Sequence, residues 1–176
     1  MQKGAALRCV FPEEVIALRV KEIAAEINSL YEGKPLIVVC VLKGAFMFFS
    51  DLVKELTVGP QLDFVRLASY GSGTKTTGDV MLVKDVELSL EGKHVLIVED
   101  VIDSGHSMDF LLKLFAVRGA ASLRLAVLVD KRERREIDVT PNFVGFTVHK
   151  GFIVGYGLDC AEQYRECPAI YELAVE

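Results

Sequence analysis

The stretch HVLIVEDVIDSGHSMDF, residues 94–110, decides the fold. Its opening residues are apolar and mostly β-branched, and such a run predicts a strand over residues 95–99 that is buried on both faces. Glu99 and Asp100 lie where this strand is expected to end, and Asp103 follows in a short polar turn. A helix is predicted after the turn, because apolar residues recur there at helical spacing. A buried strand that leads through a polar turn into a helix is the repeating unit of an α/β protein.

The rest of the chain repeats this alternation of apolar strands and amphipathic helices. Strands are predicted over residues 35–42, 62–70, 80–86 and 122–129, and helices over residues 11–30, 45–56 and 106–118. The pattern predicts a doubly wound α/β fold with a mainly parallel central sheet. The final third breaks the alternation. We therefore expect residues 1–176 to form a single domain, with a small hood built by the N-terminal segment and residues from about 140 to 176.

Composition and charge narrow the function classes. The chain has 176 residues, 51% of them hydrophobic, with a formal net charge of −5 and an isoelectric point of about 5.3. An acidic chain is poorly suited to nucleic acid, since phosphate binding depends on a basic surface. The longest apolar run, residues 36–42, is far too short to cross a bilayer, and the four cysteines match neither a zinc nor a redox spacing. We therefore expect a cytoplasmic protein in a reducing compartment, with neither nucleic acid nor a membrane as a partner.

The acidic strand end has two interpretations. Ligands of open α/β sheets bind beyond the carboxyl ends of the strands. There Glu99 and Asp100 can hold a divalent metal or accept hydrogen bonds from the hydroxyls of a ribose, or they can form a solvated acidic loop. The residues that follow favour a ligand: Gly105 lets the backbone approach an anion, and Ser104 and Ser107 add hydroxyl donors at a helix start. This pattern predicts a cradle for a monophosphate, with an ordinary helix cap as the alternative.

Four segments together resemble one known family. VLIVEDVIDSGHSM (95–108) is similar to the phosphoribosyl-pyrophosphate motif of type I phosphoribosyltransferases. LKGAFMFFSDL (42–52), SYGSGTKTTGDV (69–80) and DKRERREIDVTPNFVGFTVHKGFIVGYGLD (130–159) resemble the 6-oxopurine branch, the hypoxanthine or hypoxanthine-guanine phosphoribosyltransferases. The resemblance covers nearly the whole chain in the correct order. It implies purine salvage, in which a magnesium-dependent enzyme transfers the 5-phosphoribosyl group from phosphoribosyl pyrophosphate to N9 of hypoxanthine or guanine, giving IMP or GMP and pyrophosphate.

The resemblance also implies a role for each residue around phosphoribosyl pyrophosphate. Glu99 and Asp100 match the acids beside the ribose hydroxyls and their Mg²⁺, and Asp103 matches the general base that acts at N7 of the purine. The residues implied for the 5′-phosphate are Asp103, Ser104, Gly105, His106 and Ser107. Those implied for pyrophosphate are Lys43, Gly44 and Arg165, with a non-proline cis peptide within residues 42–44. Ser69 and Tyr70 match the start of a flexible active-site loop that acts as a lid.

Four further residues match the purine side of the family's site. Lys131 matches the lysine that donates to the 6-oxo group, Phe152 the ring that stacks on the base, and Ile153 the residue whose backbone reads the base edge. Asp159 matches a contact near the base and a ligand of a second Mg²⁺. The implied metal ligands are thus Glu99, Asp100 and Asp159. Most of the charge run 131–136 is expected to be solvated surface, and no role is expected for the basic neighbours of Lys131.

Three alternatives stay open at this point. A nucleotide-binding regulator of the RNA-attenuator type is built on the same fold, but it needs a basic face. A receiver-type signalling domain also clusters acids at strand ends, but it has no use for the Ser-Gly-His-Ser loop. A phosphoribosyltransferase that prefers xanthine differs in contacts to the 2-position of the base, which the sequence does not determine. Members of the resembled family form dimers or tetramers, so a homodimer or homotetramer is expected.

Overall fold

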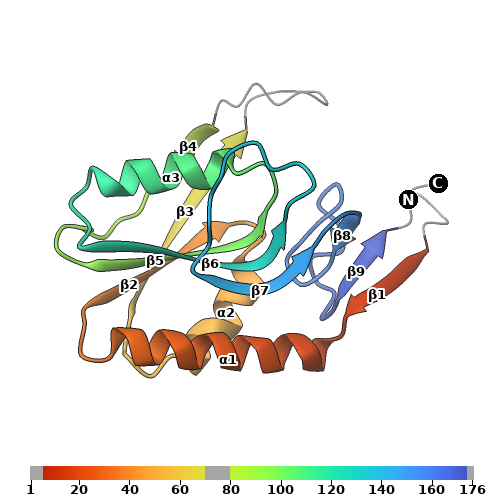
Figure 1. Ribbon diagram of the computed structural model, residues 1–176, viewed down its shortest axis with the longest axis horizontal. Coiled ribbons are helices and arrows are strands. Elements are labelled where there is room, and N and C mark those ends of the chain that lie inside the picture. Colours follow the sequence, from red (N-terminus) through yellow and green to blue (C-terminus); the bar gives the residue numbers. More distant parts are fainter. Residues whose placement is uncertain (1–5, 70–79, 174–176) are drawn as a thin grey trace.

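The central sheet of the molecule has six strands (Figure 1). The structure is a computed structural model that describes residues 6–69 and 80–173. Across the sheet the strands are ordered β4 (Val80–Lys84), β3 (Gln61–Ser69), β2 (Leu36–Leu42), β5 (His94–Ile102), β6 (Ser122–Lys131) and β7 (Phe143–Val148). Neighbours from β3 to β7 pair in parallel, whereas β4 pairs antiparallel with β3. The predicted α/β fold with a mainly parallel sheet is confirmed.

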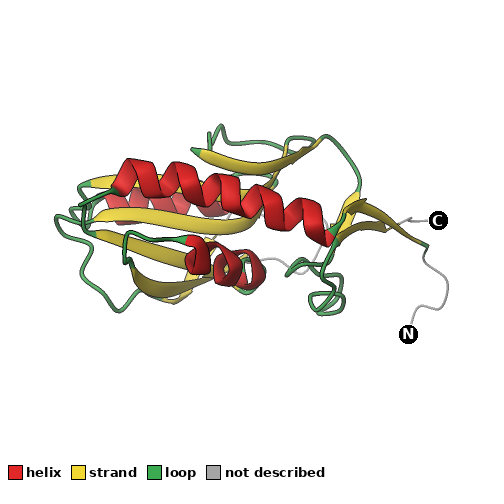
Figure 2. Ribbon diagram, turned by 90° about the horizontal axis from the view of Figure 1, so that it is seen from below, coloured by secondary structure: helices red, strands yellow, loops and turns green. Residues whose placement is uncertain are grey.

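The helices cover both faces of this sheet, as expected for a doubly wound fold (Figures 1 and 2). The first two, α1 (Glu13–Tyr31) and α2 (Phe46–Glu55), lie on one face, and α3 (His106–Ala116) lies on the other. Pro12 is the N-cap of α1, with Glu13 and Glu14 in the first turn, where acidic side chains suit the positive end of the helix dipole.

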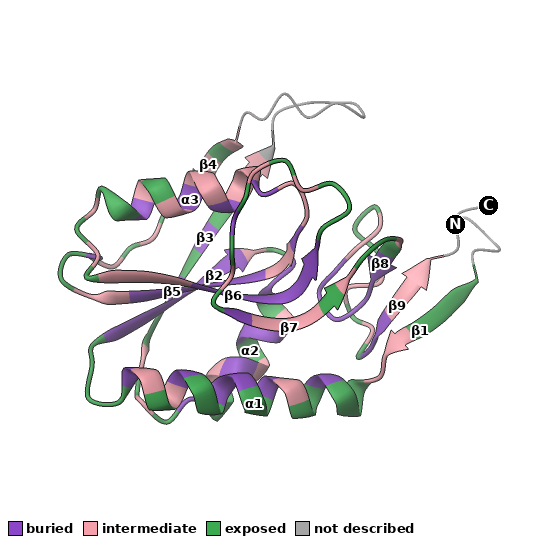
Figure 3. Cartoon of the chain, in the orientation of Figure 1, coloured by how far each residue is buried: buried purple, intermediate pink, exposed green. Residues whose placement is uncertain are grey.

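Strand β2 shows why its sequence is apolar without interruption. Val38 and Cys40 belong to the core that includes α1 and α2, and Ile37 and Val39 belong to the core that includes α3. Side chains that alternate across this strand therefore all meet apolar neighbours, and Figure 3 shows β2 as largely buried. Burial raises the pKa of the Cys40 thiol to about 12, so this cysteine is a protonated core residue.

The hood is a second, antiparallel sheet at one end of the molecule. Its order is β1 (Leu7–Phe11), β9 (Ile170–Leu173) and β8 (Phe152–Val154), so strands from the two ends of the chain pair with each other. It lies beyond the carboxyl ends of the parallel strands (Figure 1). This position brings the connection between β8 and β9 over the edge of the sheet where ligands of such folds bind.

The boundary expected for the hood, about residue 140, is wrong for one element. β7 lies after that boundary but pairs in parallel with β6 and completes the central sheet. The alternation of strands and helices did not predict this, because the connection between β6 and β7 contains no helix. Arg19 of α1 holds β7 in place, since its guanidinium donates to the carbonyls of Val144 and Gly145.

Strand β5 runs further than its sequence indicated. It was expected to end at Glu99 but continues through Asp100 to Ile102. Parallel pairing with β6 continues to Ile102 opposite Asp130, and this pairing carries the acids within the strand rather than beyond it. The expected loop 71–79 and Tyr70 lie outside the described residues.

Two observations bear on the expectations about a membrane and a reducing compartment. Over the described residues, the longest helices are too short or too polar to cross a membrane. All four cysteines are free thiols: Cys9, Cys40, Cys160 and Cys167. The cytoplasmic location expected from the cysteine pattern stays a prediction.

Candidate active site

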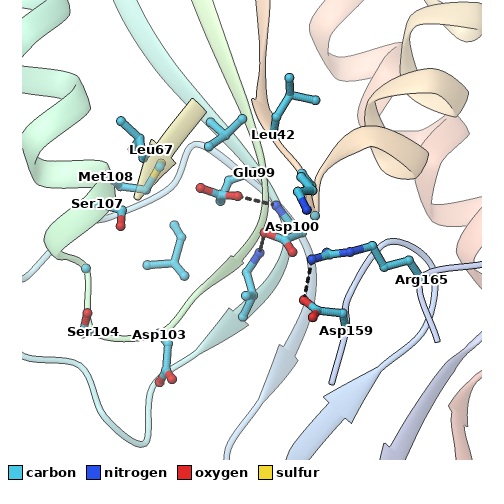
Figure 4. Close-up of a pocket in the computed structure, with 16 residues that line it drawn as sticks. Leu42, Leu67, Glu99, Asp100, Asp103, Ser104, Ser107, Met108, Asp159 and Arg165 are labelled. Carbon is cyan, nitrogen blue, oxygen red and sulfur yellow. Dashed lines mark hydrogen bonds and ion pairs between the residues drawn. The ribbon is translucent and has the colours of Figure 1, made fainter. Parts of the chain in front are cut away.

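A pocket of about 460 Å³ opens at the carboxyl ends of β2 and β5 (Figure 4). It is lined by the β2–α2 loop, the end of β5, the start of α3 and the connection between β8 and β9. The candidate residues among its lining are Lys43, Gly44, Glu99, Asp100, Asp103, Ser104, Gly105, Ser107, Asp159 and Arg165. Figure 4 shows the two serines toward one end, Asp159 and Arg165 toward the other, and the acidic pair between them.

The acidic pair occupies the middle of the pocket. Glu99 is only 7% exposed, and its Oε1 accepts a hydrogen bond from the backbone N–H of Asp100 at 3.0 Å. Asp100 Oδ1 accepts one from the backbone N–H of Val101 at 2.9 Å. Burial raises the pKa of Glu99 well above its ordinary value, and the neighbouring Asp100 carboxylate raises it further. Bound hydroxyl groups or a cation would relieve this unfavourable charge.

The turn between β5 and α3 forms one end of the pocket, called here the phosphate end (residues 103–107). Gly105 has a φ of +95°, and a Cβ at this position would lie 2.5 Å from the carbonyl oxygen of Ile137. The carbonyl of Ser104 accepts hydrogen bonds from the backbone N–H groups of Glu136 and Ile137, each at 3.0 Å. Ser104, Gly105 and Ser107 thus border the pocket beside the first turn of α3, where free N–H groups favour an anion.

The segment after β6 was misjudged from the sequence. Arg134 Nη2 donates to Asp103 Oδ2 at 2.5 Å, and Arg135 Nε donates to the carbonyl of Asp103 at 2.9 Å. Arg135 also donates to the carbonyl of Ile102 at 3.1 Å and to the buried Asp130 carboxylate at 2.5 Å. Only 15% of the Arg135 side chain is exposed. Arg135 is therefore an exception in a charge run that was expected to be mostly solvated surface, and its contacts were not expected.

The signal for these contacts was present in the topology. β5 and β6 are neighbours in the sheet, so the residues that follow each strand emerge side by side. A charge run that follows one strand can therefore form hydrogen bonds with the turn that follows the neighbouring strand of the sheet. Sequence spacing alone does not reveal this, because Arg134 and Asp103 are 31 positions apart.

The opposite end, called here the pyrophosphate end, is made by residues 42–44 and 157–165. The peptide between Leu42 and Lys43 is cis, as the resemblance implied. A Cβ on Gly44 would lie 1.7 Å from Asp100 Oδ2, and a Cβ on Gly157 would lie 2.0 Å from the carbonyl oxygen of Gly44. The β2–α2 loop is thus enclosed between β5 and the hood, with no room for a side chain at Gly44.

Ion pairs join the two segments of the pyrophosphate end. Lys43 Nζ lies 2.9 Å from Glu162 Oε2. Arg165 donates to the carbonyl of Gly157 at 2.7 Å and pairs with Asp159 Oδ1 at 2.8 Å. Arg165 Nε is buried and has no hydrogen-bond partner within residues 6–69 and 80–173. One N–H of the Arg165 guanidinium is therefore left without an acceptor.

Several candidate residues lie outside this lining. Lys131 is buried at the end of β6, with its Nζ 3.8 Å from Glu133 Oε2. Phe152 and Ile153 begin β8, the former 41% exposed and the latter buried. His106 turns its ring to Glu136, with Nε2 2.8 Å from Oε2. Of the two residues expected at the start of the lid, Ser69 ends β3 and Tyr70 is outside the described residues.

The pocket also has apolar lining that the sequence did not point to. Leu67 of β3 and Met108 of α3 contribute to it, together with Val41 at the end of β2. Each was expected to be an ordinary core or strand residue. Apolar walls exclude water and strengthen electrostatic interactions in the pocket.

The donor set partly fits a divalent cation. Within the described ranges, no group of three His, Cys, Asp or Glu side chains is arranged to hold a metal. Asp159 pairs with Arg165, and its Oδ2 accepts a hydrogen bond from the backbone N–H of Glu162 at 2.8 Å. Glu99 and Asp100 still supply adjacent carboxylates, which fit a hard cation that takes its other ligands from substrate and water.

Comparisons with known proteins agree on one family. The phosphoribosyl transferase domain matches residues 11–161. A hypoxanthine-guanine phosphoribosyltransferase of Bacillus subtilis is 42% identical over 170 residues, covering 97% of this chain and 94% of that protein. The bifunctional protein TilS/HprT of Listeria monocytogenes is 40% identical over 163 residues, which are 93% of this chain and 25% of that protein. A crystal structure of a hypoxanthine phosphoribosyltransferase from Staphylococcus aureus is 40% identical, with a TM-score of 0.91 over 95% of this chain and 91% of that chain.

Proposed function

Since the chain belongs to the phosphoribosyl transferase domain family, we propose that it is a purine-salvage enzyme that transfers the 5-phosphoribosyl group of phosphoribosyl pyrophosphate to hypoxanthine. The products would be IMP and pyrophosphate, and guanine would be a further substrate that gives GMP. The observation that carries this proposal is the order of groups along the pocket. An anion-binding turn, an acidic pair and a second cationic end follow one another (Figure 4). Phosphoribosyl pyrophosphate has the matching order of phosphate, ribose hydroxyls and pyrophosphate.

Mg²⁺ is the proposed cofactor, with Glu99 and Asp100 beside the ribose hydroxyls and Asp159 near a second ion. When bound, the metal would neutralise charge on the leaving pyrophosphate. The acidic pair would accept hydrogen bonds from the ribose hydroxyls and so fix the sugar between the two ends of the pocket. The burial of Glu99 makes such partners favourable, because an isolated buried charge is costly.

At the pyrophosphate end, Lys43 and Arg165 would stabilise the leaving group. Both are cations that line the pocket, and both are held there by carboxylates of the 159–162 segment. Cations placed where negative charge develops lower the barrier of the reaction. Ser69 and Tyr70 would begin a lid that excludes water from the reacting C1′.

At the other end, Asp103 would accept the proton that the purine loses as N9 attacks C1′. Lys131 would donate to the 6-oxo group, Phe152 would stack on the ring, and Ile153 would read the base edge through its backbone. A site built around a donor leaves the amino group of adenine poorly matched, so adenine would be rejected. A preference for xanthine over hypoxanthine is the alternative within the same reaction.

The decisive experiment is a steady-state assay of the whole chain with phosphoribosyl pyrophosphate and Mg²⁺. Hypoxanthine, guanine, xanthine and adenine are supplied in turn, and nucleotide formation is followed by chromatography. We expect rapid IMP formation, some GMP, and little or no product from adenine. Equal use of adenine would contradict the role of Lys131, and no turnover of any base would contradict the function. Filter binding to RNA at physiological salt tests the regulator alternative.

Replacing Asp103 by Asn tests the proposed base. Turnover is expected to fall by about 100-fold or more, because general-base catalysis contributes that much, while KM for phosphoribosyl pyrophosphate changes little. Asp109→Asn is the matched control, since Asp109 also forms an ion pair, with Lys113 at 2.8 Å, but lies on α3. Full kcat in the Asp103 variant at neutral pH would remove Asp103 from the reaction.

The proposal also covers the oligomeric state and the cellular location of the protein. We expect a homodimer or homotetramer in the cytoplasm, because the resembled family forms both. Light scattering of the purified chain measures the assembly directly.

A further inference from the structure

The two carboxylate oxygens of Asp103 have different surroundings. Oδ2 accepts a hydrogen bond from Arg134 Nη2 at 2.5 Å. Oδ1 is buried and, within the described residues, has no hydrogen-bond partner. Asp103 also lines the pocket, and its side chain is 27% exposed. One oxygen is therefore anchored, and the other is left without a donor.

The backbone around Asp103 is fixed by the same segment that carries Arg134. Arg135 binds the Asp103 carbonyl, and the N–H groups of Glu136 and Ile137 bind the next carbonyl. These contacts hold the main chain but leave the carboxylate free to rotate about its own side-chain bonds. Among the described residues, Arg134 is the side chain whose hydrogen bond restricts that rotation.

Orientation matters because a base must present a lone pair to the proton that it accepts. A carboxylate whose plane rotates freely presents either oxygen in many directions. A guanidinium that binds one oxygen restricts the rotation of the plane and so narrows the directions that the carboxylate can take. The Arg134 side chain is 67% exposed, so this pair adds little to the stability of the fold.

We propose that Arg134 is a positioning residue that binds Asp103 Oδ2 and thereby fixes the carboxylate that accepts the purine proton. Arg134 has this role only if the function proposed above is correct. It acts through Asp103 and need not touch the base. Its contribution belongs to turnover and not to the binding of phosphoribosyl pyrophosphate.

The test compares Arg134→Ala with Arg132→Ala in the intact enzyme. The two arginines match well: their side chains are 67% and 68% exposed, and each pairs with an aspartate. Arg132 pairs with Asp130, which keeps Arg135 as a second partner. With hypoxanthine, we expect kcat of Arg134→Ala to fall about 10-fold, as expected for a misplaced reacting group. KM for phosphoribosyl pyrophosphate should stay within about twofold, and Arg132→Ala should keep wild-type kcat.

A conservative variant and a double-mutant cycle separate positioning from a general structural effect. Arg134→Lys should restore part of the lost turnover, because an ammonium still reaches a carboxylate but lacks the planar fork. In the Asp103→Asn background, Arg134→Ala should cause no further loss, since the group it positions is gone. The melting temperature should be the same in all Arg134 variants.

Three results would overturn the proposal. Wild-type kcat in Arg134→Ala would show that Asp103 needs no such partner. A further loss in the Asp103→Asn background would show that Arg134 acts elsewhere. If the wild-type chain makes no nucleotide from any base, the proposed function fails and Arg134 loses its role with it, whereas an active wild type with unaffected Arg134→Ala rejects the positioning role alone.

Discussion

The two ends of the pocket are built in different ways. The phosphate end is one continuous segment, the turn from β5 into α3, supported by the backbone of residues 136–137. The pyrophosphate end joins parts of the chain that are distant in sequence, such as Lys43 and Glu162, which are 119 positions apart. It depends on the docking of the hood, where Gly157 meets the carbonyl of Gly44.

One glycine from each end, Gly105 and Gly44, shows how the kind of neighbouring atom decides what a substitution would damage. At Gly105 the neighbouring atom is a backbone carbonyl, which cannot move without its strand or loop. At Gly44 it is the carboxylate of Asp100, a side chain that can rotate away. The same substitution should therefore damage folding at Gly105 and chemistry at Gly44.

The largest effect is expected for Gly44→Ala. The new methyl group would occupy the place of Asp100 Oδ2, 1.7 Å from the ideal Cβ, so the carboxylate must leave its position in the middle of the pocket. We expect kcat/KM for phosphoribosyl pyrophosphate to fall about 100-fold, because a small displacement of an active-site group has an effect of this size. The melting temperature should stay close to that of the wild type. Steady-state kinetics and thermal unfolding measure the two quantities.

Gly33→Ala is the control for Gly44→Ala. Gly33 has a φ of +70° and no atom within 4 Å of its ideal Cβ, so it reports backbone cost without a change in the pocket. It should lose about 1 kcal/mol of stability and keep full activity. Normal kinetics in Gly44→Ala would show that Asp100 need not stay where it is.

The second effect, Gly105→Ala, tests the phosphate end. The positive φ and the 2.5 Å approach to the Ile137 carbonyl oxygen both oppose a side chain. We expect a loss of about 2 kcal/mol in the free energy of unfolding, which lowers the melting temperature by about 2–4 °C per kcal/mol in a protein of this size. An unchanged melting temperature would mean that the backbone of the turn moves to make room for the methyl group as easily as the Asp100 side chain does at Gly44.

Tyr156→Phe should have a smaller effect and should act on the hood. The Tyr156 hydroxyl donates to Asp51 Oδ2 of α2 at 2.7 Å, next to the Gly157–Gly44 contact. Loss of a partly buried hydrogen bond to a charged group should cost about 1.5 kcal/mol. Amide hydrogen exchange should become faster around residues 155–158 while β5 stays protected. Equal loss of protection in β5 would mean that the hood and the sheet open together.

The smallest effect is expected for Glu162→Gln, which releases Lys43 from its exposed ion pair. Exposed pairs contribute about 0–1 kcal/mol, so stability should hardly change. Without this competing carboxylate, the affinity for pyrophosphate should rise about twofold to threefold, measured by product inhibition. Glu136→Gln is the matched control at the phosphate end: Glu136 pairs with His106 and is 63% exposed, against 64% for Glu162. A similar gain in both variants would mean that net charge, and not Lys43, is responsible.

The sequence predicted that the residues of the turn after β5 lie together, because they are neighbours along the chain. Glu99 to Ser107 follow from one strand, one turn and one helix start, and the rule that ligands bind at carboxyl ends places them in a pocket. The roles given to Gly44 and Arg165 came from resemblance to a family, because no local pattern links residues so far apart. Those roles stay predictions until substrates are tested.

Two other features of the structure could not be predicted from the sequence, each for a physical reason. The contact of Arg134 with Asp103 depends on which strands are neighbours in the sheet, and periodicity does not encode that. The place of β7 in the central sheet depends on a connection without a helix, which the alternation rule does not cover. In both cases, the observed arrangement depends on which strands pair in the sheet.

The pairing of β1 with β9 also sets an order of events during synthesis. The ribosome makes β1 early and β9 last among the described strands, so β1 must wait for nearly the whole chain to emerge before it finds its partner. The nascent chain can complete β5 and α3 well before that moment. Newly made molecules can therefore form the turn between β5 and α3 first and the closing contact on Gly44 last, so the finished pocket is a late product of translation.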